Sequence, residues 1–316
     1  MNTDKTDRTE PEGIIVVDKP VGPTSFDVVY KLRKALHTKS IGHCGTLDPL
    51  ASGVVVCCVG RYTKLVRFLT SDDKRYVADV TFGFSTPSLD LETEAIEHGD
   101  PAVVTEETLR AALSSWRGVV QQVPPLHSAL QKDGVRLYHM ARAGHDVEVD
   151  ARDVVIHDLE LVSYTAPTAT IACHVGKGFF VRSLARDLGV AVGCPAHLSG
   201  LRRTDSGGYT LDDAVSLDVA RDPARAHLAL KHGRQALRGV TQIEITESQA
   251  KTLRHGLRPL TDLPLQSEVL ACCGDEIVAV VDVRNDVGED PAKDARGGPT
   301  APVADGAHRL VSVRGF

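Results

Sequence analysis

The sequence has no long hydrophobic run, and only 4% of its residues are aromatic. Its longest apolar stretches, such as VVVCCV at 54–59, are far shorter than the ~18 residues that a membrane-spanning helix requires. The first twelve residues, MNTDKTDRTEPE, are polar and lack the apolar region of a signal peptide. We therefore expect a soluble, cytoplasmic chain in which residues 1–12 form a disordered tail.

Cysteine is present, but not in a pattern that supports cross-links or metal binding. The 316-residue chain has seven cysteines, an odd number, and no two of them are spaced as C-x-x-C. This arrangement argues against a disulfide framework and against a structural zinc site. We expect reduced and mostly buried thiols.

Acidic residues outnumber basic ones overall, yet one region is basic. The formal net charge is −6, which by itself argues against a nucleic-acid partner, because phosphate binding depends on lysine and arginine. Between Lys19 and Tyr76, however, six lysines and four arginines stand against four aspartates and no glutamate. This local excess of positive charge keeps nucleic acid open as a partner of the region.

Alternating short strands and helices predict an α+β fold. GIIVVDKP at 13–20 is typical of a buried strand, and apolar residues follow it at helical spacing behind Thr24 and Ser25. GVVVCCVG and RYVADVTFG predict strands with a short helix, TKLVRFL, between them. TEETLRAALSSWRG at 105–118 predicts a helix capped by Thr105. DVVIHDLELVSY and TATIACHV predict paired strands. The glycines of GKGFFVRSLARDLG predict a turn from a strand into a helix.

A second, smaller unit is predicted after an irregular basic stretch at 220–240. IEITESQAKTLRHG predicts a strand and a capped helix, and EVLACCGDEIVAVVDV predicts a hairpin. Residues 285–306 are rich in Asp, Gly, Pro and Ala and predict a flexible loop. We therefore divide the chain into the tail, a main unit at 13–235 and a second unit at 240–316.

One carboxylate, Asp48, lies among three glycines in IGHCGTLDPLASG at 41–53. Asp before Pro often starts a turn, and glycine supplies the positive φ angles that tight turns need. Taken alone, the stretch is therefore explained as a turn. The rest of the chain has to decide whether the carboxylate has a function.

Five motifs resemble the tRNA pseudouridine synthases of the TruB family in their order and spacing. They are DKPVGPTS, GHCGTLDPLASGVV, DKRYVADVTFG, GKGFFVRSLARDLG and LSGLRRTDSGGY. The resemblance covers residues 13–218, and the motif around Asp48 is its most specific part. It implies an α+β catalytic domain with a mixed, largely antiparallel sheet flanked by helices. The second unit is similar to the small, β-rich PUA-type RNA-binding domain of bacterial members.

The resemblance implies that the chain isomerises one T-loop uridine of tRNA to pseudouridine, with no cofactor and no metal. The ribose leaves the ring nitrogen of the uracil and rejoins the same base at C5. Asp48 would be the nucleophile, acting on a base removed from its stack. A desolvated carboxylate takes up a proton unless a cation keeps it ionised, and Arg182 occupies the family position that pairs with this aspartate.

Two aromatic residues are implied at the target base. Tyr76 would hold the flipped pyrimidine, although a half-buried strand tyrosine explains it equally well from pattern alone. Phe180 stands where the family usually has tyrosine. A stacking role survives this change, whereas a role for a phenol hydroxyl in proton transfer from C5 does not.

Further substrate contacts are implied with less specificity. Asp90 matches an acidic position connected to Arg182, but the glycine that usually follows it is missing here. Lys19 would either touch phosphate or support the turn at Pro20. The remaining implied contacts with uracil or RNA are His43, Leu201 and Arg202.

Three kinds of protein remain in competition. The first is the uridine-isomerising enzyme, acting as a monomer on the T-stem-loop of tRNA. The second is a catalytically silent tRNA-binding or tRNA-folding protein on the same scaffold. The third, an enzyme of small metabolites, has least support, because no phosphate-binding glycine loop or Ser-His-Asp order is apparent. Asp48, Tyr76 and Arg182 together favour the first.

Overall fold

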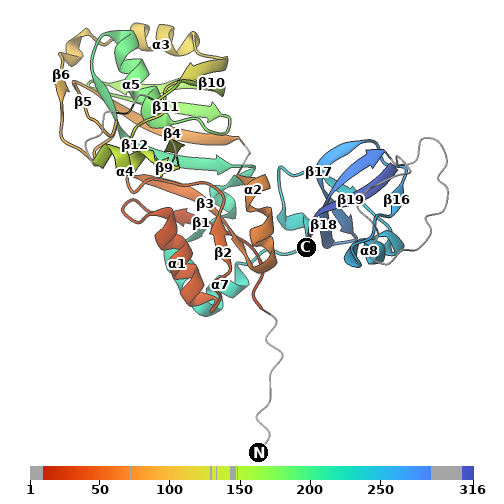
Figure 1. Cartoon of the computed structure of the whole chain (residues 1–316). Coiled ribbons are helices and arrows are strands. Elements are labelled where there is room, and N and C mark those ends of the chain that lie inside the picture. The colour runs from red at the N-terminus through yellow and green to blue at the C-terminus, as the bar shows by residue number, and fades with distance from the viewer. Residues whose placement is uncertain are drawn as a thin grey trace, which may run out of the picture.

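The computed structural model describes residues 10–70, 73–128, 130–132, 134–142, 147, 149–285 and 308–316. Within these ranges the chain forms a large mixed sheet with helices and a separate five-stranded sheet beside it (Figure 1). No helix among them has the length and apolar character needed to cross a membrane. The tail predicted at 1–12 lies mostly outside the described residues, and so does the loop predicted at 285–306.

The large sheet runs through both halves of the main unit. Its strands pair antiparallel except for two parallel pairs, β1 with β14 and β3 with β12. The mixed, largely antiparallel sheet expected from the sequence is therefore confirmed. The strand order is β14 (Val215–Ser216), β1 (Gly13–Lys19), β3 (Ala51–Val59), β12 (Ala196–Ser206), β4 (Lys74–Phe82), β11 (Thr168–Val175), β10 (Arg152–Thr165) and β7 (Gly118–Gln122), with β2 (Ile41–His43) on β3 and β13 (Tyr209–Thr210) on β12.

Helices pack against this sheet because the side chains on the faces of its strands are apolar. Ile15 and Val17 of β1 belong to the main core, whereas the alternate residues Ile14 and Val16 belong to a second core on the opposite face. Burial on both faces explains the unbroken apolar sequence of β1. The helices are α1 (Ser25–Ala35), α2 (Val66–Leu69), α3 (Glu106–Ser114), α4 (Leu137–Arg142), α5 (Val181–Val192), α6 (Leu217–Arg221) and α7 (Pro223–Leu228).

The predicted helix starts are confirmed by their caps. Thr24 caps α1 and Thr105 caps α3, each in a reciprocal capping box. The turn from a strand into a helix that was predicted at the glycines of GKGFFVRSLARDLG is confirmed, because β11 ends at Val175 and α5 begins at Val181. Gly178 adopts a φ of 79°, which interrupts the extended backbone and lets the chain turn directly into the helix.

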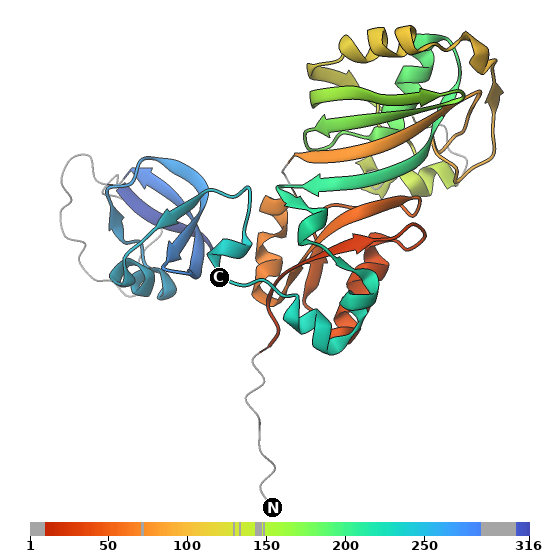
Figure 2. The same ribbon diagram turned by 180° about the vertical axis from the view of Figure 1, so that it is seen from behind.

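The C-terminal unit is a five-stranded sheet with one helix, seen from behind in Figure 2. The predicted hairpin is present as the antiparallel pair β17 and β18, and Thr246 caps the predicted helix. The sheet order is β15 (Gln242–Glu244), β17 (Gln266–Cys273), β18 (Glu276–Asn285), β19 (His308–Gly315) and β16 (Leu260–Thr261), with α8 at Glu247–Arg254.

The two units share a hydrophobic core. Leu65 and Leu69, near the short helix α2, are buried in the same cluster as Leu270 and Ile277 of the C-terminal sheet. The ammonium of Lys64 donates a hydrogen bond to the backbone carbonyl of Gly315 at 2.8 Å. The C-terminal unit therefore covers apolar surface of the main unit. The division between 235 and 240 stays a prediction.

Candidate active site

Asp48 lies in the short loop between β2 and β3, and backbone contacts fix this loop. Ser25, at the first turn of α1, accepts a hydrogen bond from the N–H of Leu47 at 2.7 Å and donates one to its carbonyl at 3.2 Å. On the other side of Asp48, the carbonyl of Pro49 accepts from the N–H of Gly22 at 2.8 Å. The carboxylate is therefore carried by a rigid backbone.

A buried arginine of β12 supports the same loop from below. Arg203 is 1% exposed, and its guanidinium donates to the carbonyls of Val54, Thr46 and Gly45 at 2.7, 3.4 and 3.2 Å. Its backbone lies so close to Gly53 that a Cβ on this glycine would lie 2.1 Å from the Arg203 carbonyl oxygen. Glycine is therefore required at 53, and Arg203 acts as a structural residue here.

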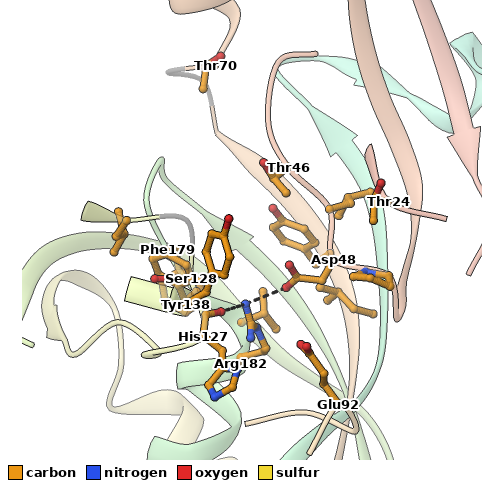
Figure 3. Close-up of a pocket in the computed structure, with 17 residues that line it drawn as sticks. Thr24, Thr46, Asp48, Thr70, Glu92, His127, Ser128, Tyr138, Phe179 and Arg182 are labelled. Atoms are coloured by element: carbon orange, nitrogen blue, oxygen red, sulfur yellow. Dashed lines mark hydrogen bonds and ion pairs between the residues drawn. The ribbon is translucent and has the colours of Figure 1, made fainter. Parts of the chain in front are cut away.

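Arg182, in the first turn of α5, reaches Asp48 across the site (Figure 3). Its Nη2 lies 3.0 Å from Asp48 Oδ2 and also donates to the carbonyl of His127 at 2.8 Å, while Nη1 donates to the carbonyl of Ser88 at 3.1 Å. The Arg182 side chain is 7% exposed. Two backbone carbonyls thus fix the guanidinium beside the carboxylate, as the sequence predicted for this pair.

Asp90 completes the charge network behind Arg182. Its Oδ2 lies 3.4 Å from Arg182 Nη1, its side chain is 3% exposed, and Oδ1 accepts from the N–H of Glu92 at 2.9 Å. The structure therefore brings Asp90 to Arg182 even though the usual following glycine is absent. Leu89, just before it, has a φ of 63°, a conformation that glycine adopts more easily.

The environment of Asp48 disfavours its charge overall. Burial raises the pKa of the Asp48 carboxyl above its ordinary value, Arg182 opposes this rise, and the nearby Asp90 and Glu92 add to it. The side chain remains 36% exposed, so the carboxylate faces the cavity while its backbone is fixed. A carboxylate that is desolvated, oriented and held by one cation suits nucleophilic attack.

Asp48 and Arg182 form part of the wall of a cavity of about 690 Å³. Apolar and aromatic side chains contribute most of the remaining wall (Figure 3). Such a cavity has room for one nucleotide base. The residues that line it are Thr24, Thr46, Leu47, Asp48, Pro49, Thr70, Tyr76, Glu92, His127, Ser128, Leu130, Tyr138, Phe179, Phe180, Val181, Arg182 and Leu201.

Three predicted substrate contacts line this cavity: Tyr76, Leu201 and Phe180. Tyr76 on β4 is 9% exposed. Phe180 precedes α5, where the side-chain amide of Gln122 fixes its backbone by accepting from its N–H at 2.8 Å and donating to its carbonyl at 3.1 Å. The backbone of this aromatic residue is therefore positioned by β7, a contact that sequence spacing does not show.

Four others do not line the cavity: Asp90, described above with Arg182, and Lys19, His43 and Arg202. Lys19 is fully buried, and its ammonium donates to the carbonyls of Pro20 and Pro23 at 3.0 and 2.7 Å. Burial lowers its pKa to about 8. Of the two roles considered for Lys19, turn support matches this placement and phosphate contact does not.

His43 and Arg202 also lie away from the cavity lining. His43 is the last residue of β2, and its pKa is lowered first by burial and second by the nearby charge of Arg203. Arg202 pairs with Asp18 at 2.9 Å.

Several cavity residues were not predicted from the sequence. Tyr138 on α4 points its ring into the cavity, and His127 and Ser128 contribute from the loop after β7 (Figure 3). Phe179 lies beside Phe180 but belongs to no aromatic position that the motif singled out. These residues come from segments between the motifs, so only the three-dimensional arrangement reveals them.

Comparison with known proteins identifies the family of the chain. The family model described as "TruB family pseudouridylate synthase (N terminal domain)" matches residues 33–181, and that described as "tRNA pseudouridylate synthase B C-terminal domain" matches residues 182–263. The chain is 43% identical to tRNA pseudouridine synthase B of Deinococcus radiodurans over 85% of this chain and 95% of that one. It is 38% identical to the protein of that name from Bacillus pumilus, over 85% and 88% of the two chains.

A solved structure shows the same architecture. The crystal structure of a Cbf5-Nop10-Gar1 complex contains a chain that superimposes with a TM-score of 0.67 at 25% identity, over 85% of this chain and 78% of that one. The two family models together cover residues 33–263 without a gap. Each of the two curated relatives named above is more than 30% identical to this chain, over most of this chain and most of its own length. The chain therefore belongs to the TruB family of pseudouridylate synthases.

Proposed function

We propose that the chain converts one uridine in the T loop of tRNA into pseudouridine, with Asp48 as the nucleophile. The observation that carries this proposal is the Asp48–Arg182 pair in the wall of a base-sized, aromatic-lined cavity. The reaction breaks the bond between ribose C1′ and N1 of the uracil and makes one between C1′ and C5. The C5 proton leaves and N1 gains a proton, so nothing is oxidised or reduced.

Each part of the cavity has a role in this reaction. The target uridine must leave its stack to reach Asp48, and Tyr76, Phe180 and Leu201 offer an apolar surface that compensates for the lost stacking. Arg182 opposes the effect of burial on the Asp48 carboxyl and so favours its ionised, nucleophilic form. The rigid loop limits the motion that Asp48 must lose before attack.

The decisive test is formation of pseudouridine by the purified chain. We expect turnover on an unmodified tRNA transcript without added nucleotide or cofactor, and none on a transcript in which the T-loop target uridine is replaced by cytidine. Binding without turnover would support the tRNA-binding or tRNA-folding alternative. Turnover at a uridine elsewhere in the tRNA would contradict the T-loop assignment while leaving the chemistry intact.

Changes at Phe180 separate stacking from proton transfer. We expect Phe180→Tyr to be nearly neutral and Phe180→Ala to slow single-turnover conversion by about 5- to 150-fold, because loss of a base-stacking aromatic costs ~1–3 kcal/mol. Tyr138 keeps a phenol in the cavity of both variants. The measurement is single-turnover kinetics on tRNA with deuterium at C5 of the target. A large gain in rate for Phe180→Tyr, with a smaller isotope effect, would contradict a pure stacking role.

Removal of the C-terminal unit tests its part in RNA binding. We expect a chain that ends at residue 235 to fold, to convert a T-stem-loop fragment, and to bind full-length tRNA less tightly. Because Leu65 and Leu69 would lose their apolar cover, the truncated chain should have a melting temperature at least about 2–4 °C below that of the parent. This difference corresponds to ~1 kcal/mol of unfolding free energy. Thermal unfolding by circular dichroism and filter binding measure both effects. Equal affinity for full-length tRNA would contradict the RNA-binding role.

A further inference from the structure

Two histidines and an aspartate meet on the surface of the large sheet, outside the catalytic cavity. Asp73 directly precedes β4, His157 is in β10 and His174 is in β11. One ligand atom from each lies within 4.8 Å of the other two. His157 Nε2 lies 3.0 Å and His174 Nε2 3.8 Å from Asp73 Oδ2, and the two rings are 4.5 Å apart.

A β-bulge brings the two histidines together. Asp158 of β10 pairs directly with His174 of β11, whereas the next registered pair is Ile156 with Val175, so His157 is the extra residue of β10. In a regular strand, neighbouring side chains point to opposite faces. A bulge changes this alternation and re-aims a side chain, and it allows His157 to lie beside His174 on one face.

The aspartate is held in place independently of the histidines. The backbone carbonyl of Asp73 accepts a hydrogen bond from the N–H of Gly207 at 3.0 Å, which attaches it to the end of β12. Its side chain is 52% exposed, and those of His157 and His174 are 36% and 26% exposed. The three residues are therefore anchored through different segments of the chain, yet an ion from solvent can reach their side chains.

Charged residues of the neighbouring strands flank the cluster. Arg75 pairs in register with His174 on one side and with Asp205 on the other. Asp205 therefore neighbours Arg75 in the sheet, where opposite charges on adjacent strands interact favourably.

We propose that Asp73, His157 and His174 form a binding site for one divalent transition-metal ion of the zinc type, completed by solvent. Imidazole with one carboxylate is a ligand set that such ions prefer. In a tetrahedral zinc site, metal–ligand bonds of about 2.0–2.2 Å place ligand atoms ~3.3 Å apart, close to the two measured separations. The ion would fasten the beginning of β4, which carries Tyr76, to the β10–β11 pair.

The cysteines do not compete at this place. Among the seven cysteines, all free, only Cys273 is not buried, and it lies in the C-terminal sheet. The sequence also gives no zinc spacing, because successive ligands of the three are 84 and 17 residues apart in the numbering. A site of this kind arises only from the fold, so the absence of C-x-x-C motifs does not bear on it.

The test uses the full chain, purified without a histidine tag and stripped with chelator. We expect isothermal titration to show one Zn²⁺ per chain and Co²⁺ to give visible d–d bands of low symmetry. His157→Asn and His174→Gln should each weaken Zn²⁺ binding at least tenfold. His37→Asn is the matched control, because His37 is an exposed histidine elsewhere, with a φ of 51° that asparagine tolerates. It should bind as the parent does.

Two further readouts separate the possible outcomes. Zn²⁺ should raise the melting temperature of the parent and of His37→Asn but not of His157→Asn, because ligand binding to the folded state stabilises it. A thiolate-to-cobalt charge-transfer band would show binding at cysteine and overturn the proposal. Unchanged affinity in both histidine variants, or no binding by the parent, would also overturn it and leave the cluster as a hydrogen-bonded group.

Discussion

Asp48→Asn is expected to abolish pseudouridine formation while leaving tRNA affinity within about threefold of the parent. Loss of the nucleophile should reduce single-turnover conversion at least ~1,000-fold, or about 4 kcal/mol of transition-state stabilisation. Asparagine retains the size of the side chain and one oxygen that can accept from Arg182. The carboxylate itself is therefore the only chemical group lost. Parallel filter-binding and pseudouridine assays on the same transcript measure the two effects.

The fold of this variant should remain intact, which makes the result interpretable. The pKa of Asp48 is raised in the folded state, so the folded chain binds a proton there more readily than the unfolded chain. Ionisation of Asp48 therefore reduces stability as the pH rises through this pKa, and asparagine does not ionise. We expect a melting temperature at pH 7.5 equal to or above that of the parent. Substantial turnover by the pure variant would contradict the nucleophile assignment, whereas a large decrease in melting temperature would contradict the expectation of an intact fold.

The central pair of the site was predictable, because the motifs that carry it are specific. GHCGTLDPLASGVV identified Asp48 and FFVRS identified Arg182, and the structure places their side chains 3.0 Å apart. The predicted strands of the main unit are also largely present, since buried strands such as β1 have unbroken apolar sequences. What could not be read from the motifs is how the pair is held, because Ser88 and His127 contribute only backbone carbonyls.

Charged residues near the site show where sequence reasoning ends. Lys19 and Arg203 lie in the motifs and carry the charge expected of RNA contacts, yet both are buried and donate to backbone carbonyls. A sequence gives the charge of a side chain but not the direction in which it points. The Asp73, His157 and His174 cluster was missed for a related reason, because the bulge at His157 depends on the register of two strands.

Arg182→Met is expected to reduce activity at neutral pH by at least ~100-fold and to shift its pH dependence. Methionine fills similar space but provides no charge, so the effect of burial on Asp48 would no longer be opposed by the guanidinium. The pKa of Asp48 would rise further above its ordinary value, and less carboxylate would be ionised at a given pH. Activity should therefore recover partly as the pH rises, by up to ~tenfold per pH unit below the new pKa.

Two companion variants separate charge from folding. Arg186→Met removes an arginine one helical turn later on α5, where the side chain pairs with Asp187 and is 29% exposed, and should retain the parent pH profile. Loss of Arg182 also leaves Asp90 buried without its cation, which destabilises the fold. The double change Arg182→Met with Asp90→Asn should restore much of the melting temperature without restoring activity at pH 7.

The pH profile of single-turnover conversion, measured from pH 6 to 9, decides the role of Arg182. The acid limb of the parent reports ionisation of Asp48 and should lie above the ordinary range for aspartate, because burial raises this pKa. The limb of Arg182→Met should lie at higher pH still. If the variant loses activity with an unchanged limb, Arg182 acts by orienting Asp48 or the base rather than by its charge. If the variant retains the activity of the parent and the same acid limb of the pH profile, the ion pair has no part in the reaction.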